Sequence, residues 1–295
     1  MRTVDLILPA AESYLPGDFI VHRALPRREL RRVGGFVFFD HFDQLGVTPE
    51  LFDLPPHPHV GLQTVTYLFE GEILHTDSLD YQQRIVPGDV NWMTSGKGIT
   101  HSEQVTELQP RIHGVQSWVG LPHDKRQINP AFEHYANQGL PRIEAGNVSM
   151  TLIAGETGGL RSPISTYQQL TYMDIAAEAG GTMGISVNPM HELAVYVCEG
   201  AVNIGGNDVN LHDLAKLSAG ERFSFTANTK ARLVLLGGEP LPDPTVIYWN
   251  FITDSLGEAK QCLIDWEEGK FPPVRKYRKI SEAGDEYPPE RMKLL

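Results

Sequence analysis

The spacing of glycine and proline strongly limits what this chain can fold into. Its 295 residues include 28 glycines and 21 prolines, which interrupt the sequence at short intervals. Many short strands separated by closely spaced turns are typical of an all-β sandwich or barrel. The runs rich in β-branched and aromatic residues between these breaks are 36–39, 64–69, 90–93, 116–119, 148–153, 170–175, 194–198 and 233–236.

One segment near the C-terminus has the periodicity of a helix instead. Residues 255–268 place apolar side chains on one helical face. Ser255 and Glu258 form a capping-box pattern at its start, and Gly269 ends it. The apolar residues of this face are Leu256, Ala259, Leu263 and Trp266. The sequence therefore predicts one short C-terminal helix in an otherwise all-β protein.

Two short motifs occur twice in the same order. Tyr67–Gly71 is echoed by Tyr196–Gly200, 129 residues later, and the turn at Gly88 is echoed at Gly220, 132 residues later. Similar offsets for both echoes favour two related β domains. Between about 125 and 145, turn-forming residues leave few runs that resemble strands. We therefore expect a first domain over 1–135 and a second over 136–295.

The charge of the chain excludes several classes of partner. Its net charge of −12 argues against direct binding to nucleic acid or to an anionic membrane. The basic run at 275–279 is interpreted as a solvated tail segment. No stretch approaches the roughly 18 apolar residues of a membrane helix. Only two cysteines are present, so no disulfide framework is expected and the cytoplasm is the predicted location.

Two pairs of residues have the spacing and chemistry of metal ligands. His57 and His59 lie two residues apart in a proline-stiffened stretch, and His101 and Glu103 have the same spacing. In an extended chain, residues i and i+2 point to the same side. Antiparallel strands between the pairs could bring them together around one divalent ion. Three neutral nitrogens and one carboxylate suit a first-row metal.

Any single histidine is more often a packed or surface residue than a ligand. The pairing of two same-face motifs raises the metal interpretation above that alternative. We expect the remaining histidines without a comparable pairing to be structural or exposed: His75, His113, His123, His134, His191 and His212.

The segments around these residues resemble a known family. Residues 57–71 and 87–103, together with 38–42 and 113–118, are similar to the pirin family of bicupins. This resemblance implies two tandem cupin barrels (double-stranded β-helices). It also implies that His57, His59, His101 and Glu103 bind a single metal, commonly iron, in the N-terminal barrel. The C-terminal barrel of this family is usually metal-free.

The second half of the chain contains no comparable ligand pair. Adding the two offsets to the ligand positions gives Ser186 and Asn188, then Leu233 and Leu235. No HxH or HxE pair follows residue 140, and the adjacent His191 and Glu192 would point to opposite faces of a strand. We therefore expect the second barrel to hold no metal.

One position departs from the family pattern. Relatives often have glutamate where this chain has Gln63, so a carboxylate in the metal's outer shell is expected to be missing. Loss of such a partner commonly costs about 10–100-fold in metal affinity or activity.

The family resemblance implies a choice of functions. Bacterial members resemble quercetin 2,3-dioxygenases, which suggests a small aromatic flavonol and O2 as substrates, Fe(II) as the metal and Glu103 as general base. Trp92, Met93 and Trp118 are candidates to line the pocket. Animal pirin is a transcriptional co-regulator, so a non-enzymatic, metal-responsive regulator with a protein partner is the main alternative. Sugar-type isomerase chemistry is a third. Other first-row metals fit the same ligands.

Overall fold

In the computed structural model, residues 1–242 and 245–280 are described, and they form two compact units that are not continuous in sequence. We name each unit after the segment that forms most of it. The N-terminal unit contains 12–22, 39–137 and the described residues from Pro242 on. The C-terminal unit contains 1–11, 23–38 and 138–241. The first eleven residues and the described residues from Pro242 on thus each belong to the unit that is formed mainly by the other half of the chain.

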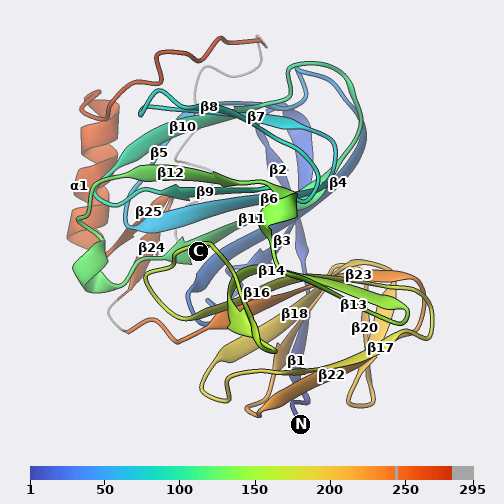
Figure 1. The fold of residues 1–295 in the computed structure, drawn as a ribbon. Helices are drawn as coiled ribbons and strands as arrows, with labels where there is room; N and C mark the ends of the chain where they lie inside the picture. Colours follow the sequence, from blue (N-terminus) through green and yellow to red (C-terminus); the bar gives the residue numbers. More distant parts are fainter. Residues whose placement is uncertain (243–244, 281–295) are drawn as a thin grey trace. The chain divides into compact units, whose positions relative to one another are not determined.

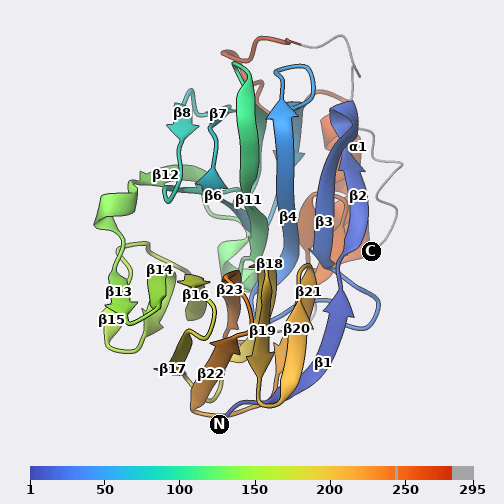
Figure 2. The ribbon, with the colours of Figure 1, turned by 90° about the vertical axis from the view of Figure 1, so that its right-hand side faces the viewer.

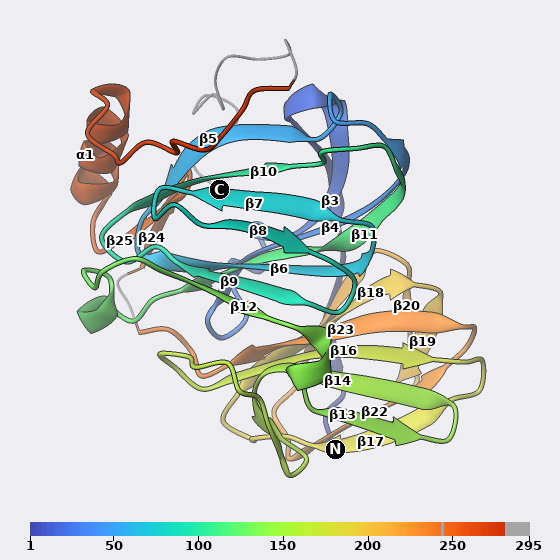
Figure 3. The same cartoon turned by 45° about the horizontal axis from the view of Figure 1, so that its top comes forward.

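The N-terminal unit is built from a seven-stranded and a four-stranded sheet. The larger sheet has the spatial order β12 (Ala131–Tyr135), β9 (Val90–Thr94), β6 (Leu62–Glu70), β11 (Gln109–Gly120), β4 (Phe36–Val47), β3 (Phe19–Leu25) and β2 (Ala11–Leu15). The smaller sheet has the order β5 (Asp53–His59), β10 (Ile99–Gln104), β7 (Ile73–Asp77) and β8 (Gln82–Ile85), as Figure 3 shows.

Apolar side chains from both sheets pack together in the interior of this unit. Phe19 and Phe42 come from the larger sheet, and Leu54 and Ile73 come from the smaller one; all belong to one buried cluster. The rings of Phe19 and Phe52 meet edge to face, with centroids 4.7 Å apart. Burying each such side chain contributes about 1.5–3 kcal/mol. This cluster fixes the spacing of the two sheets, and the polar residues discussed below are not part of it.

The chain after Pro242 completes the N-terminal unit. The hairpin of β24 (Val246–Tyr248) and β25 (Phe251–Thr253) leads into α1 (Leu256–Glu267), which lies beside these strands in Figure 1. The Ser255 hydroxyl accepts a hydrogen bond from the Glu258 amide at 3.2 Å, so the predicted N-cap is confirmed. Gly269 follows the helix with φ of +70°, which favours glycine. No helix in the described part of the chain is long and apolar enough to cross a membrane.

The basic run near the C-terminus is attached to this unit more closely than a solvated tail would be. The Tyr277 hydroxyl donates to Asp53 Oδ1 at 3.1 Å, and the Gln104 amide donates to the Arg278 carbonyl at 3.0 Å. Lys276 donates to the Asp80 carbonyl at 2.6 Å. The charged side chains remain exposed, but the backbone of the segment is docked beside β5 and β10.

The C-terminal unit repeats the two-sheet design. Its larger sheet has the order β1 (Val4–Pro9), β21 (Asp213–Leu217), β18 (Glu192–Glu199), β23 (Ala231–Gly238), β16 (Leu170–Ala177), β14 (Val148–Thr157) and β13 (Arg142–Ala145), with β15 (Leu160–Arg161) paired to β14. Its smaller sheet has the order β17 (Thr182–Ser186), β22 (Arg222–Ala227), β19 (Ala201–Ile204) and β20 (Asn207–Asn210). In the described part of the chain, three short 3-10 helices connect strands: Pro16–Asp18, His123–Lys125 and Asn137–Gly139.

The first residues of the chain are tied into this unit. Strand β1 pairs antiparallel with β21, as seen in Figure 2. The buried Arg2 guanidinium donates to four backbone carbonyls at 2.8–2.9 Å. These carbonyls belong to Asn188, His191, Ser218 and Gly220. Removing this side chain would leave several buried acceptors unpaired, so Arg2 explains why the N-terminus joins the second half of the chain.

The strand orders of the two units correspond, which supports the predicted internal repeat. Strand β6 corresponds to β18, and these strands carry the Tyr67 and Tyr196 motifs. The second echo is wrong: Gly88 precedes β9, whose counterpart is β21, whereas Gly220 precedes β22, whose counterpart is β10. The offset between equivalent residues therefore changes along the chain.

Candidate metal centre

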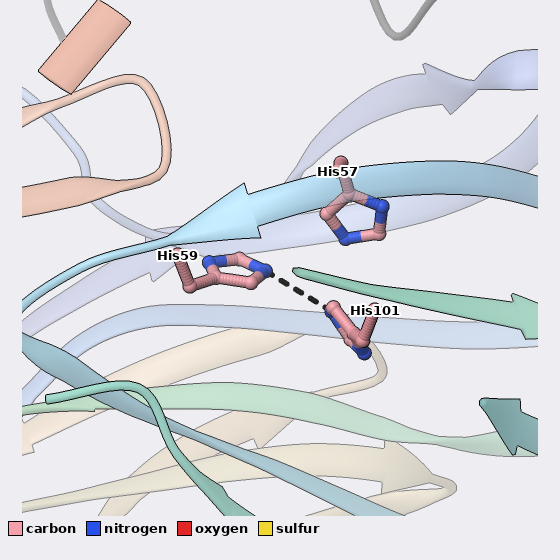
Figure 4. Close-up of side chains that lie close together, drawn as sticks. All are labelled: His57, His59 and His101. Carbon is pink, nitrogen blue, oxygen red and sulfur yellow. Dashed lines mark hydrogen bonds between the residues drawn. The ribbon is translucent and has the colours of Figure 1, made fainter. Parts of the chain in front are cut away.

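Two neighbouring strands of the N-terminal unit carry three histidines on one face. His57 and His59 lie on β5, and His101 lies directly opposite His57 on the antiparallel strand β10. Residues two apart in a strand share a face, and directly paired residues share one as well. The three imidazoles therefore point to the same place, as Figure 4 shows. We call them the histidine triad.

The rings of the triad are close enough to share one ion. The Nε2 atoms of His59 and His101 are 3.1 Å apart. The ring centroid of His57 lies 5.1 Å from that of His59 and 4.4 Å from that of His101. One nitrogen from each ring lies within 4.8 Å of the others. The structure thus brings together three of the four predicted ligands.

Burial keeps these imidazoles neutral. Loss of water around the ring lowers the pKa of His57 to about 4. The same cause, with smaller effects from neighbouring histidines, holds the pKa of His59 and His101 well below 6.5. A neutral imidazole offers a lone pair to a metal, and a protonated one does not. The donor set therefore fits a first-row divalent ion.

The proline-rich sequence before the triad also fixes one ring. His57 Nδ1 lies 2.8 Å from the carbonyl oxygen of Pro55, which can only accept, so Nδ1 carries the proton. The lone pair of His57 is then on Nε2. This is the type of outer-shell hydrogen bond that orients a metal-binding histidine.

Glu103 lies beside the triad but not within it. It follows His101 by two residues on β10, after a register shift against β5. Its Oε1 accepts a hydrogen bond from the Thr66 hydroxyl at 3.1 Å. Burial raises the pKa of the Glu103 carboxyl, an effect partly offset by His75 and Thr66. Among the described residues, the group whose ligand atoms converge within 4.8 Å contains the three histidines without Glu103.

His75 is a residue of this region that sequence reasoning missed. We expected it to be structural or exposed, yet it lies on β7 directly opposite Glu103, and its Nδ1 is 3.4 Å from Nδ1 of His101. Its Nε2 is 3.1 Å from Asp77 Oδ2. The signal was available: His75 and Asp77 are two residues apart, the same spacing that singled out the other pairs.

The three aromatic or sulfur-containing candidates for the pocket wall have different positions. The ring of Trp118 meets that of His59 at an angle of 74°, with centroids 5.1 Å apart. Met93 packs with Ile99 and Phe132 in a small cluster on the inner side. Trp92 is fully buried, and because neighbours in a strand alternate, it points to the opposite face from Met93.

Gln63 also lies on that opposite face. Its amide donates to the Thr94 hydroxyl at 2.9 Å. Thr66, which does contact Glu103, lies three residues after Gln63 on β6 and therefore points to the other face of that strand. The side chain at position 63 is therefore directed away from the triad, so it does not act as an outer-shell partner of these histidines.

In the C-terminal unit, the strand that corresponds to β10 carries buried apolar side chains. Strand β22 is the counterpart of β10, and its Phe223 and Phe225 belong to a large buried apolar cluster. Leu233 and Leu235, the positions reached by the sequence offset, belong to the same cluster. These side chains offer no donor atoms to a metal.

Four other histidines pair with groups other than the triad. His113 Nε2 lies 3.0 Å from Nε2 of the buried His41, a pairing that the sequence did not indicate. His191 contacts the Thr171 hydroxyl and His134 contacts the Asn91 side chain. His123 is exposed and pairs with Asp254 at 2.6 Å.

Comparison with known proteins accounts for this arrangement. The family model for pirin matches residues 18–119, and the model for the pirin C-terminal cupin domain matches residues 172–272. The chain belongs to the pirin family. The chain has two cupin domains and is mostly β-sheet, so the predicted fold and family are confirmed.

Several pirin relatives cover nearly the whole chain. A pirin-like protein of Caulobacter vibrioides is 39% identical over 275 residues, 91% of this chain and 94% of that protein. A Pseudomonas aeruginosa protein named "Putative quercetin 2,3-dioxygenase" is 36% identical over 262 residues, which are 88% of this chain and 82% of that protein. The crystal structure of quercetin 2,3-dioxygenase from Acinetobacter baumannii is 31% identical and has a TM-score of 0.87, covering 96% of this chain and 95% of that one.

Proposed function

We propose that this member of the pirin family is a metal-dependent dioxygenase that acts on flavonols such as quercetin, with Fe(II) as its metal. The observation that carries the proposal is the histidine triad, which presents three buried, neutral imidazoles to one point. The names of the Acinetobacter and Pseudomonas relatives support the substrate class. A reducing cytoplasm, where ferrous iron is available, is compatible with the thiol form of the two cysteines, Cys198 and Cys262.

Each nearby side chain has a role in this proposal. The triad would hold the ion, and the ion when bound would supply the redox and Lewis-acid chemistry for reaction with O2. Glu103 would complete the ligand set and take the proton of the substrate hydroxyl. Its raised pKa makes it a stronger base than an exposed carboxylate, and Thr66 holds one of its oxygens in place. Trp118 would present an aromatic edge to a flat substrate.

Two substitutions separate metal binding from catalysis. Glu103→Gln keeps the size of the side chain but removes its charge and basic oxygen. We expect it to lower turnover by about 10²–10⁴, the usual contribution of a general base, while three histidines still hold metal. His59→Ala should lose metal and activity together, because it deletes one of the three buried nitrogens.

The measurement is oxygen uptake with quercetin, with metal content determined on the same preparations. Glu107→Gln and His123→Ala, two exposed positions, serve as matched controls and should behave like wild type. Wild-type turnover by metal-loaded Glu103→Gln would contradict the base assignment. No oxygen uptake by the iron-loaded wild type with several flavonols would overturn the enzyme proposal in favour of a metal-responsive regulator.

A further inference from the structure

Asp77 is a buried carboxylate held by three donors. Its Oδ1 accepts hydrogen bonds from the backbone amides of Leu79 and Tyr81, at 2.8 and 3.1 Å. Its Oδ2 lies 3.1 Å from Nε2 of His75. The side chains of Asp77 and His75 are 0% and 3% exposed, so water does not replace these partners. A carboxylate can only accept, and Nε2 of His75 must therefore carry a proton.

The proton on His75 Nε2 determines the state of the next ring. In neutral His75, the other nitrogen, Nδ1, has a lone pair and can only accept. That atom lies 3.4 Å from Nδ1 of His101, so His101 must carry its proton on Nδ1. The lone pair of His101 is then on Nε2, the atom that faces His59 in the triad.

We propose that His75 and Asp77 form a positioning pair that sets the tautomer of His101 and so prepares the triad for metal. The inference rests on the metal site of the proposed function, but it concerns residues outside the ligand set. The opposite arrangement, with hydrogen-bond directions reversed from Asp77 onward, would place a proton on His101 Nε2 and block its lone pair. The ionised carboxylate at the end of the chain excludes that arrangement.

Packing fixes the orientation of the His75 ring relative to Asp77. The His75 ring stacks on Phe132 with centroids 4.3 Å apart and an angle of 12° between the planes. The ring of Phe132 also packs against the ring of Tyr81, with centroids 5.2 Å apart. The Tyr81 amide is itself one of the donors to Asp77. The ring plane of His75 and the direction of its Nδ1 lone pair are thus fixed by residues on both sides.

Asp77→Asn tests the direction of the hydrogen bonds. The two backbone amides should retain the asparagine carbonyl oxygen at the Oδ1 position, which turns the NH2 group toward His75. His75 Nε2 must then accept, its Nδ1 must donate, and His101 should carry its proton on Nε2. We expect zinc affinity to fall about 10–100-fold although every ligand remains.

The tautomers can be read directly by long-range proton–nitrogen NMR of the metal-free protein, which separates protonated ring nitrogens from those with a lone pair. Wild type should show a protonated Nδ1 on His101, and Asp77→Asn should show a protonated Nε2. Asp89→Asn is the matched control, because Asp89 is a buried carboxylate 3.5 Å from a histidine, His134, outside the triad. It should leave both readouts unchanged.

Two substitutions of His75 give an independent test. His75→Phe keeps the stacking on Phe132 but removes the acceptor, so zinc affinity should fall as in Asp77→Asn. His75→Asn places a carbonyl oxygen near the former Nδ1 position and should retain more of the affinity. A protonated Nε2 on His101 in wild type, or an unchanged tautomer and zinc affinity in Asp77→Asn, would overturn the positioning pair. Wild type that shows the expected tautomer but binds no zinc would instead overturn the proposed function.

Discussion

Acid should destabilise the metal-free N-terminal unit through the histidine triad. An unfolded histidine takes up its proton near pH 6.5, whereas burial lowers the pKa of folded His57 to about 4. Between these values the unfolded state binds more protons than the folded state. The free energy of unfolding therefore decreases as the pH falls through this window, and the loss is complete only near pH 4.

The size of the effect follows from the same pKa difference. For His57, the linkage relation gives a loss of about 2 kcal/mol between about pH 7.5 and pH 5. His59 and His101 stay neutral to lower pH, so each should contribute a similar amount. The triad would then remove up to about 6 kcal/mol by pH 5. That is comparable with the whole stability of many domains.

Tryptophan fluorescence can follow this unit alone. All four tryptophans, Trp92, Trp118, Trp249 and Trp266, lie in the N-terminal unit. Urea unfolding of chelator-treated protein is measured at both pH values for wild type and for His57→Gln, which cannot titrate. The variant should lose about 2 kcal/mol less than wild type on acidification. His123→Gln, at an exposed position, is the control and should match wild type.

Equal pH dependence in wild type and His57→Gln would refute the reasoning, since it would mean that His57 titrates alike in the folded and unfolded states. Saturating metal should raise the free energy of unfolding by a similar amount at both pH values, because the folded imidazoles are already neutral across this window and the ion binds only that form.

Three further predictions concern separate features. Zinc affinity, measured by calorimetry, should persist to about pH 5 and weaken toward pH 4, where His57 titrates; unperturbed imidazoles would lose it from about pH 6.5. Ser255→Ala should destabilise the N-terminal unit by about 1 kcal/mol in the fluorescence assay, because it removes the cap of α1; an unchanged midpoint would contradict this role. Arg2→Leu should destabilise the C-terminal unit by at least about 2 kcal/mol by circular dichroism, since it leaves buried carbonyls without donors; Arg27→Leu, a mostly exposed contact, should have a smaller effect.

The part of the site that could be predicted from sequence is the part encoded by local geometry. A strand places residues i and i+2 on one face whatever surrounds it, so His57 and His59 could be paired before the fold was known. The helix after Ser255 was predictable for a similar reason, because its capping pattern is local. In both cases the chemistry and the spacing lie within a few residues of each other.

The features that the sequence did not indicate depend on long-range pairing. Strand β1 joins the C-terminal unit through β21 and through Arg2, more than 180 residues from its partners. The pairing of His41 with His113 likewise joins residues that are 72 positions apart in the sequence. His75 was not predicted for a different reason, since its partner two residues away is an aspartate, whereas the two predicted ligand pairs join a histidine to a second histidine or to a glutamate.

The most direct test of the account is the metal content of the protein purified without added metal. Elemental analysis of wild type and His59→Ala should find about one equivalent of metal per chain in wild type, predominantly iron, and little in the variant. Two equivalents in wild type, or the same content in both proteins, would contradict a single ion held by the histidine triad.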